Sequence, residues 1–274
     1  MTTDNVTLRP PFISGSNGML ALVPAFFLMS SSAFAAVLVD NGSTLDIDSA
    51  AAPDSYAVKN NSTLNMTEAT TRSIYVQTGS TLNISGATVT ANPGQAGITI
   101  NTSRATIDRA KVTSDTIALL VNRTAGGTSG STVTAANSVF SGATAGAAVT
   151  GFGTLELINS EVTGTGAGSS GLIVAGGSAR ATGNTRISGD AAGVRFETNP
   201  PVGTASLVLD GSSVVGRNGP ALEVDDAVNA TIEVLNGSTL AGGNGNLLEV
   251  LGASTAAMRA VSYTHLTLPT IYSV

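Results

Sequence analysis

The sequence predicts an all-β protein: a right-handed, single-stranded parallel β-helix, a solenoid with three short strands per rung and about nine rungs. One repeat is written twice with little variation between Ala205 and Val250. Each copy contains three runs of alternating apolar residues separated by Gly, Asn or Asp, and alternation at period two is typical of a strand with one buried face. The same three runs can be followed back to about residue 40, which indicates a solenoid rather than a local duplication.

The first strand of each rung is recognised by an apolar anchor residue. Successive anchors are 18 to 26 residues apart. They are Leu45, Leu64, Leu82, Ile107, Val133, Leu155, Ala181, Leu207 and Ile232. These anchors define the registers of the predicted rungs.

The second strand reads Ser/Thr-x-apolar-x-Gly, and the third reads as a small residue followed by apolar-x-apolar. The second-strand motifs start at Ser138, Ser160, Thr185, Ser212 and Ser238, and shorter versions occur at Ala87-x-Val89 and Ala110-x-Val112. The third-strand motifs are Ser73 to Val76, Gly97 to Ile100, Gly171 to Val174, Gly193 to Phe196 and Ala221 to Val224. A period that holds in three separate strands favours one continuous coil.

A single rung cannot bury its apolar face, so the rungs must stack as parallel strands about 4.8 Å apart. The connections between strands one and two carry an Asn or Asp, and these residues tolerate the left-handed backbone of a tight corner. We therefore predict structural turn positions at Asn137, Asn159, Asn184, Asp210 and Asn236.

The composition agrees with an ordered, non-nucleic-acid-binding chain. Hydrophobic residues make up 42% and charged residues 11% of the sequence, which disfavours intrinsic disorder. The formal net charge is -6 and there are only two lysines, so no basic stripe is available for nucleic acid. The chain has no cysteine, and a rod held by rung stacking does not require disulfides.

Residues 1–35 are predicted to be a signal peptide with its preceding segment. An apolar run from Met19 to Met29 is too short to span a membrane, and Ala33-Phe-Ala35 resembles a signal-peptidase site, so cleavage is expected after Ala35. The flank before the run lacks the net positive charge of a secretory signal, which leaves a buried apolar segment as the alternative. Either Met1 or Met19 could be the true start.

Residues 36–260 form the predicted β-helix. Val37, Leu38 and Val39 are expected to cover the exposed edge of the first rung. The rungs that follow contain longer turns at 121–131 and 197–204. Residues 261–274 do not follow the repeat, and they hold the only histidine of the sequence, His265. They look like translated adapter sequence, so we predict that they are foreign to the fold and that the natural chain is truncated here.

The cysteine-free rungs resemble the passenger of pertactin-like autotransporters over about residues 40 to 260. The resemblance rests on two motifs that follow each other in a rung, apolar-x-apolar-Asn/Asp-Gly-Ser and then Gly-x-Ala/Gly-Leu-x-Val. The resemblance implies an exported protein at the surface of a Gram-negative bacterium, or secreted from it, that acts as an adhesin or structural stalk. It also implies a host-cell or extracellular-matrix ligand and an outer-membrane β-barrel missing from this sequence. The Arg-Gly-Asp triplet common in that family does not occur here.

Two alternatives stay open. One is a secreted β-helical polysaccharide lyase or hydrolase, which would need clustered carboxylates on one face. The adjacent pair Asp225-Asp226 resembles part of a polygalacturonase site, but neighbours on a strand point to opposite faces, so we interpret the pair as a solvated strand end. The other alternative is a passive spacer rod.

No catalytic residues, metal ligands or cofactors are predicted. Zinc and Ser-His-Asp chemistry both need a histidine within the fold. The segment from Gly242 to Val250 faintly resembles a calcium-binding nonapeptide, but Leu247 stands where the ligand Asp belongs, so a turn and strand are expected instead. Phe140 and Phe196 occupy inward anchor positions and are expected to be core residues rather than sugar-stacking platforms.

Overall fold

The computed structural model describes residues 36–123, 129–198 and 204–261. Residues from Ala35 to Val274 form one compact unit, and the coil within that unit is described here by itself. The predicted signal segment 1–35, its cleavage position Ala35, and His265 in the 262–274 part of the tail lie outside the described residues.

The described residues form strands that assemble into three parallel sheets, named A, B and C, and no helix among these residues is long and apolar enough to cross a membrane. Sheet A contains β1 (Ala36–Val39), β3 (Ser55–Val58), β6 (Ile74–Gln77), β9 (Ile98–Asn101), β12 (Ile117–Asn122), β15 (Ala145–Thr150), β18 (Ser170–Ala175), β21 (Ala192–Phe196), β24 (Leu222–Val224) and β27 (Leu248–Val250). Sheet B contains β2 (Thr44–Ile47), β4 (Thr63–Thr67), β7 (Thr81–Ser85), β10 (Arg104–Asp108), β13 (Thr132–Ala136), β16 (Thr154–Ile158), β19 (Ser178–Thr182), β22 (Thr204–Asp210), β25 (Asn229–Leu235) and β28 (Thr255–Val261). Sheet C contains β5 (Thr70–Thr71), β8 (Thr88–Thr90), β11 (Lys111–Ser114), β14 (Val139–Gly142), β17 (Glu161–Gly164), β20 (Arg186–Gly189), β23 (Ser213–Gly216) and β26 (Thr239–Gly242).

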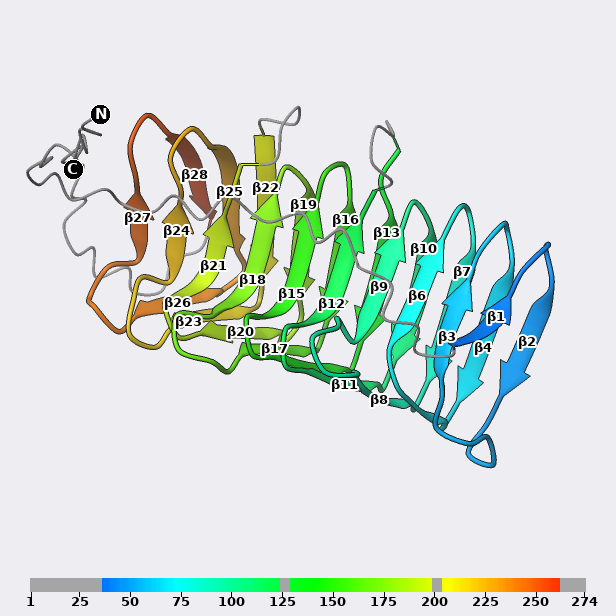
Figure 1. The fold of residues 1–274 in the computed structure, drawn as a ribbon. Helices are drawn as coiled ribbons and strands as arrows, with labels where there is room; N and C mark the ends of the chain where they lie inside the picture. Colours follow the sequence, from blue (N-terminus) through cyan, green and yellow to red (C-terminus); the bar gives the residue numbers. More distant parts are fainter. Residues whose placement is uncertain (1–35, 124–128, 199–203, 262–274) are drawn as a thin grey trace, which may run out of the picture. The chain divides into compact units, whose positions relative to one another are not determined.

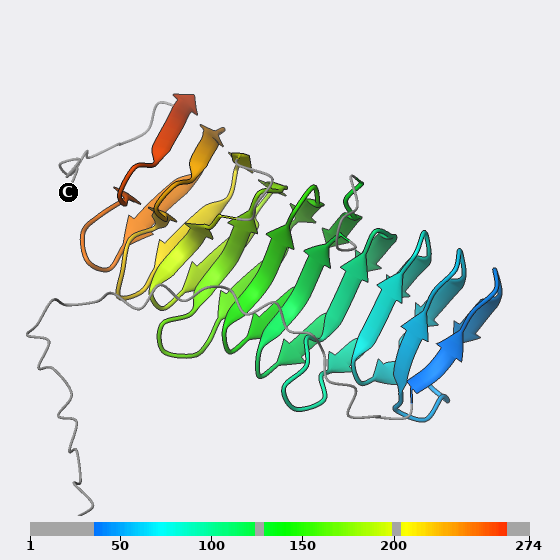
Figure 2. The same cartoon turned by 45° about the horizontal axis from the view of Figure 1, so that its top comes forward.

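From β3 onward the chain visits the sheets in a fixed order, from A to B to C and back to A, whereas β2 of the first rung leads directly to β3 without a sheet C strand. Every strand pairs in parallel with the equivalent strand of the next rung. Figure 1 shows the rungs following one another along the coil, and the tilted view in Figure 2 shows the same stacking from another side. This arrangement confirms the predicted parallel β-helix with three strands per rung. The crossover rule for parallel strands gives the coil a right-handed sense.

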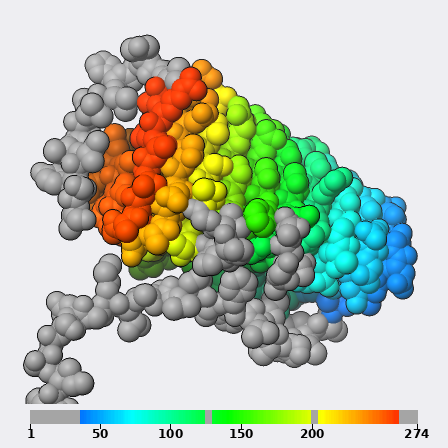
Figure 3. All heavy atoms as spheres, turned by 90° about the horizontal axis from the view of Figure 1, so that it is seen from above, coloured from blue at the N-terminus to red at the C-terminus, as the bar shows by residue number. Residues whose placement is uncertain are grey.

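The core is one continuous column of inward side chains from all three sheets. Phe140 and Phe196 are fully buried in it, as predicted. Between them in the column lie fully buried residues such as Leu155, Val162 and Leu172. Because each rung contacts mainly its two neighbours, the chain colours follow one another in bands in the space-filling view (Figure 3).

The strand registers correct two of the predicted anchors. Leu82 pairs with Ala105, not with Ile107, and Leu155 pairs with Ala179, not with Ala181. Both errors are slips of two residues. A slip of two keeps the same face inward, so alternation of apolar residues alone cannot distinguish the two registers.

The ends of the described coil differ from its middle. In β1, Val39 is buried, whereas Val37 and Leu38 are 36% and 56% exposed. At the other end β28 pairs with β25 in full register, so the repeat continues to Val261, one residue beyond the predicted boundary. The described strands on either side of both longer turns belong to sheets A and B: β12 and β13 for the first turn, β21 and β22 for the second.

Candidate functional site

The predicted turn residues lie at the corner where sheet B leads into sheet C, and they are Asn137, Asn159, Asn184, Asp210 and Asn236. The first two and the last have left-handed backbone angles, with φ of 50°, 48° and 50°. At the third and fourth corners a neighbouring glycine has this conformation instead, Gly183 with φ 67° and Gly211 with φ 64°. Each corner of this set thus has at least one residue in the left-handed region, and the last has two, Asn236 and Gly237 with φ 74°.

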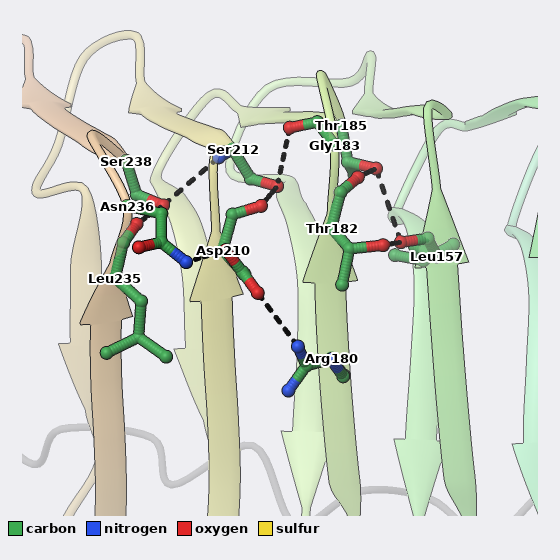
Figure 4. Close-up of polar contacts among 10 residues, drawn as sticks. All are labelled: Leu157, Arg180, Thr182, Gly183, Thr185, Asp210, Ser212, Leu235, Asn236 and Ser238. Carbon is green, nitrogen blue, oxygen red and sulfur yellow. Dashed lines mark hydrogen bonds and ion pairs between the residues drawn. The ribbon is translucent and has the colours of Figure 1, made fainter.

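A Ser or Thr with a buried or half-buried hydroxyl follows each of these turn residues: Ser138, Ser160, Thr185, Ser212 and Ser238. The hydroxyls of four of them, Ser138, Ser160, Thr185 and Ser238, each accept a hydrogen bond from a backbone N–H of the rung before. The donor–acceptor distance is 3.2 Å from Ser160 N to Thr185 Oγ1 and 3.0 Å from Ser212 N to Ser238 Oγ. The same hydroxyls donate to nearby carbonyls, as Thr185 does to Thr182 at 2.8 Å (Figure 4).

Side chains outside this hydroxyl ladder also join one rung to the next. Asp210 accepts hydrogen bonds from Arg180 Nη2 at 2.8 Å and from Asn236 Nδ2 at 2.5 Å (Figure 4). Asn159 Oδ1 accepts from the backbone N–H of Asn184 at 3.3 Å. The polar groups of this corner are therefore used to stack rungs rather than being presented to a ligand.

The glycine that ends each second-strand motif has a steric role that the sequence pattern did not reveal. These glycines are Gly142, Gly164, Gly189, Gly216 and Gly242. A Cβ built on each would lie only 1.9 to 2.2 Å from a backbone carbonyl oxygen at or just before the start of the next sheet A strand. The chain turns back on itself at this corner, and only hydrogen fits between the two backbones.

The densest group of charged side chains lies on the outer face of sheet A, and we call it the Arg195 cluster. It comprises Arg195, Glu197, Glu223, Asp225 and Glu249. In the sheet register Arg195 of β21 pairs with Glu223 of β24, which pairs in turn with Glu249 of β27. The strands thus place one guanidinium and two carboxylates in a single column across three rungs.

Arg195 is the centre of the contacts in this cluster. Its Nε and Nη2 donate to the two oxygens of Asp225 at 3.1 to 3.2 Å. Its guanidinium also lies 3.3 Å from Glu223 Oε1 and 3.7 Å from Glu197 Oε1. The Glu223 side chain is only 15% exposed, so this ion pair is screened less than an ordinary surface pair.

The surroundings change the proton affinity of two carboxyls. Burial raises the pKa of Glu223 to about 7; Arg195 opposes this effect, and Asp225 and Glu249 add to it by repulsion. Burial also raises the pKa of Glu197, again against the attraction of Arg195. Burial is the main cause of the raised pKa of Glu223, and the nearby carboxylates add to it, so the single guanidinium of Arg195 does not keep Glu223 fully ionised at neutral pH.

The structure separates the adjacent pair Asp225-Asp226. Asp225 binds Arg195 in the cluster, while Asp226 Oδ1 accepts from the backbone N–H of Ala253 at 2.8 Å. The two residues lie directly after β24, which ends at Val224, rather than on a strand, and their side chains have different partners. Asp225 is bound in an ion pair rather than simply solvated. The described residues contain no group of His, Cys, Asp and Glu arranged to hold a metal ion.

The outer face of sheet B is the broadest regular polar surface of the coil. One outward column consists of hydroxyl residues apart from Arg104 and, in the last strand, Ala257: Thr44, Thr63, Thr81, Arg104, Thr132, Thr154, Ser178, Ser206, Thr231 and Ala257. The neighbouring column begins with Asp46, Asn65 and Asn83, whose side chains are joined by hydrogen bonds of 2.7 and 2.8 Å. We call this surface the sheet B face.

The sequence analysis did not single out either the sheet B face or the Arg195 cluster. The signal for the cluster lies in the third-strand motifs, because aligning Gly193 to Phe196 with Ala221 to Val224 places Arg195 beside Glu223. Comparison of the chain with family models, curated proteins and solved structures finds no match.

Proposed function

We propose that the chain is an exported passenger of the pertactin-like autotransporter class that acts at the bacterial surface as an adhesin or structural stalk. The observation that supports this proposal most directly is the sheet B face. One of its columns repeats a hydroxyl group on most rungs at about the 4.8 Å spacing of paired strands, and the neighbouring column begins with the hydrogen-bonded side chains of Asp46, Asn65 and Asn83. A long surface of repeated weak contacts favours multivalent attachment to an extended host or matrix ligand.

Binding by the purified chain to immobilised host cells or extracellular matrix tests the adhesive function. Replacing both Thr132 and Thr154 with Asp places two charges in the hydroxyl column and should abolish binding. The matched control replaces Ser141 and Thr163 with Asp on the outer face of sheet C, and it should bind as the unaltered chain does. If the unaltered chain does not bind at all, the spacer or stalk function is favoured instead.

Export is tested by the N-terminal residue of the protein recovered from intact cells. Cleavage after Ala35 gives a mature chain that begins at Ala36, and surface display makes this chain accessible to protease added outside the cells. A chain that keeps its first residues and stays protected from external protease contradicts the passenger proposal.

A second candidate function, cleavage of a polysaccharide, is favoured by the Arg195 cluster. Sugar-bond cleavage requires one carboxyl that holds its proton near neutral pH and a second, ionised carboxylate beside it. Glu223, whose pKa is raised to about 7, meets the first requirement, and Asp225 is the carboxylate beside it. Asp225, however, uses both of its oxygens to bind Arg195. Release of reducing or unsaturated sugar ends from pectin, lost in Glu223→Gln, would support the enzyme; absence of release favours the adhesin or stalk.

A further inference from the structure

The Arg195 cluster contains an excess of negative charge that the stacking of the rungs does not explain. Among the described residues of the cluster, four carboxylates lie around the one guanidinium of Arg195 in β21. They belong to Glu223 in β24, Glu249 in β27, Glu197 directly after β21 and Asp225 directly after β24. Glu223 and Glu249 are direct partners in the parallel register, and like charges in that position repel each other. Glu249 receives one weak hydrogen bond, from Asn246 Nδ2 at 3.4 Å.

The other side of the cluster offers no further charge. The strand before β21 in sheet A is β18, and its residue in line with Arg195 is Ile173. Among the described residues, the ionisable groups that face Glu223 from β21, β27 and the ends of the strands all belong to the cluster. They are Arg195, Glu197, Asp225 and Glu249. Nothing else in these strands compensates the excess negative charge.

We propose that the Arg195 cluster is a proton-operated clamp that fastens β24 and β27 to β21 when the surroundings become mildly acidic. In the ionised state, the attraction between Arg195 and Glu223 is offset by repulsion between Glu223 and its carboxylate neighbours. Proton binding at Glu223 removes the cost of burying its charge and the repulsion from Asp225 and Glu249, while Arg195 keeps its hydrogen bonds with Asp225. The clamp does not depend on the function proposed above.

The direction of the pH effect follows from linkage. The pKa of Glu223 is higher in the folded chain, at about 7, than its ordinary value of 4.5, so the folded state binds more protons than the unfolded chain between these values. The free energy of unfolding therefore rises as the pH falls through about 7 and reaches its full gain below the ordinary value. The raised pKa of Glu197 acts in the same direction.

Hydrogen exchange of the full chain, corrected for the intrinsic pH dependence of amide exchange, tests the clamp. Exchange in β24 and β27, relative to β10, should slow by more than about tenfold between about pH 8 and about pH 5.5, because most of this range lies between the pKa of about 7 in the folded chain and the ordinary value of 4.5. Glu223→Gln, which resembles the protonated side chain, should exchange slowly at both pH values. The control Glu233→Gln, on the outer face of β25 near Arg259, should behave like the unaltered chain.

Two results would overturn the clamp. One is an exchange ratio in the unaltered chain that does not change with pH, and the other is a Glu223→Gln variant that keeps the full pH dependence. If that variant does not fold, carboxyl titration of the unaltered chain with ¹³C-labelled glutamate decides the matter. A Glu223 midpoint near 7 supports the clamp, and a midpoint near the ordinary glutamate value contradicts it.

Discussion

At the scale of single residues, the hydroxyl ladder makes Ser160 a structural residue. Its Oγ accepts from Ser138 N at 3.2 Å and donates to Ile158 O at 2.9 Å. Ser160→Ala leaves the buried N–H of Ser138 without its partner, so the free energy of unfolding should fall by about 1–3 kcal/mol. The urea midpoint measures this loss, and Ser141→Ala, which changes an outward side chain of β14, should shift it by less than about 0.5 kcal/mol. Equal shifts for the two variants would show that the ladder does not stabilise the coil.

A second prediction at this scale concerns the glycine of the second-strand motif. A Cβ on Gly189 would lie 2.0 Å from the carbonyl oxygen of Ala192, so Gly189→Ala forces the backbone to move and should cost ~3 kcal/mol. Gly168→Ala is the matched comparison, because its φ is +74° but no atom lies within 4 Å of the added Cβ. It should cost only about 1 kcal/mol. Thermal unfolding of both variants distinguishes steric exclusion from backbone strain.

The sequence predicts these residues with unequal success, for physical reasons. The left-handed backbone at three of the five corners follows from the tolerance of Asn for that conformation, whereas at the other two a neighbouring glycine adopts it instead of the predicted Asn184 and Asp210. The crowding at Gly189 does not, because it arises where chain segments on two sides of a corner meet. The ion pair of Arg195 with Asp225 joins residues 30 positions apart, so it requires the correct register as well as the correct strands.

At the scale of strands, alternation should decide which substitutions the coil tolerates. Val162 and Thr163 are neighbours in β17, but Val162 is fully buried and Thr163 lies on the outer face. Val162→Thr places a hydroxyl in the apolar column without a partner, and should lower the free energy of unfolding by about 1–3 kcal/mol. Thr163→Val makes the reverse exchange outside, and should stay within about 0.5 kcal/mol of the unaltered chain. A larger loss from the outer substitution would contradict the assigned face of β17.

Strand existence and face could be read from the sequence, whereas strand register could not be read everywhere. Leu45, Leu64 and Leu82 pair as predicted because the short early rungs repeat almost residue for residue. The predicted register is wrong by two residues at Ala105 and Ala179. At both places a small alanine points inward in the paired position, and a second inward residue follows two positions later. Alanine contributes little burial energy, so hydrophobic pattern alone gives little preference between the two registers.

At the scale of the whole coil, stability should be graded rather than uniform. Central inward residues such as Leu119, Leu155 and Leu172 are fully buried, whereas Leu248 and Val250 near the far end are only half-buried. In a solenoid each rung is held by its neighbours, so local opening costs less free energy toward the ends. The decrease in local stability toward the ends depends on stacking alone, so it could be predicted from the repeat. The half-buried state of the side chains in β27 could not be predicted from the repeat.

Hydrogen exchange followed strand by strand at one fixed pH measures this grading. Amides of β12, β15 and β18 should exchange slowest, and rates should rise step by step toward β2 on one side and toward β26 and β28 on the other. Destabilising the centre with Val162→Thr should speed exchange in β14, β17 and β20 while leaving β4 unchanged. One common rate along all the described strands would instead mean that the coil unfolds as a single unit. A graded profile means that a rung can be lost at one end without loosening the others, which is the behaviour expected of a stalk.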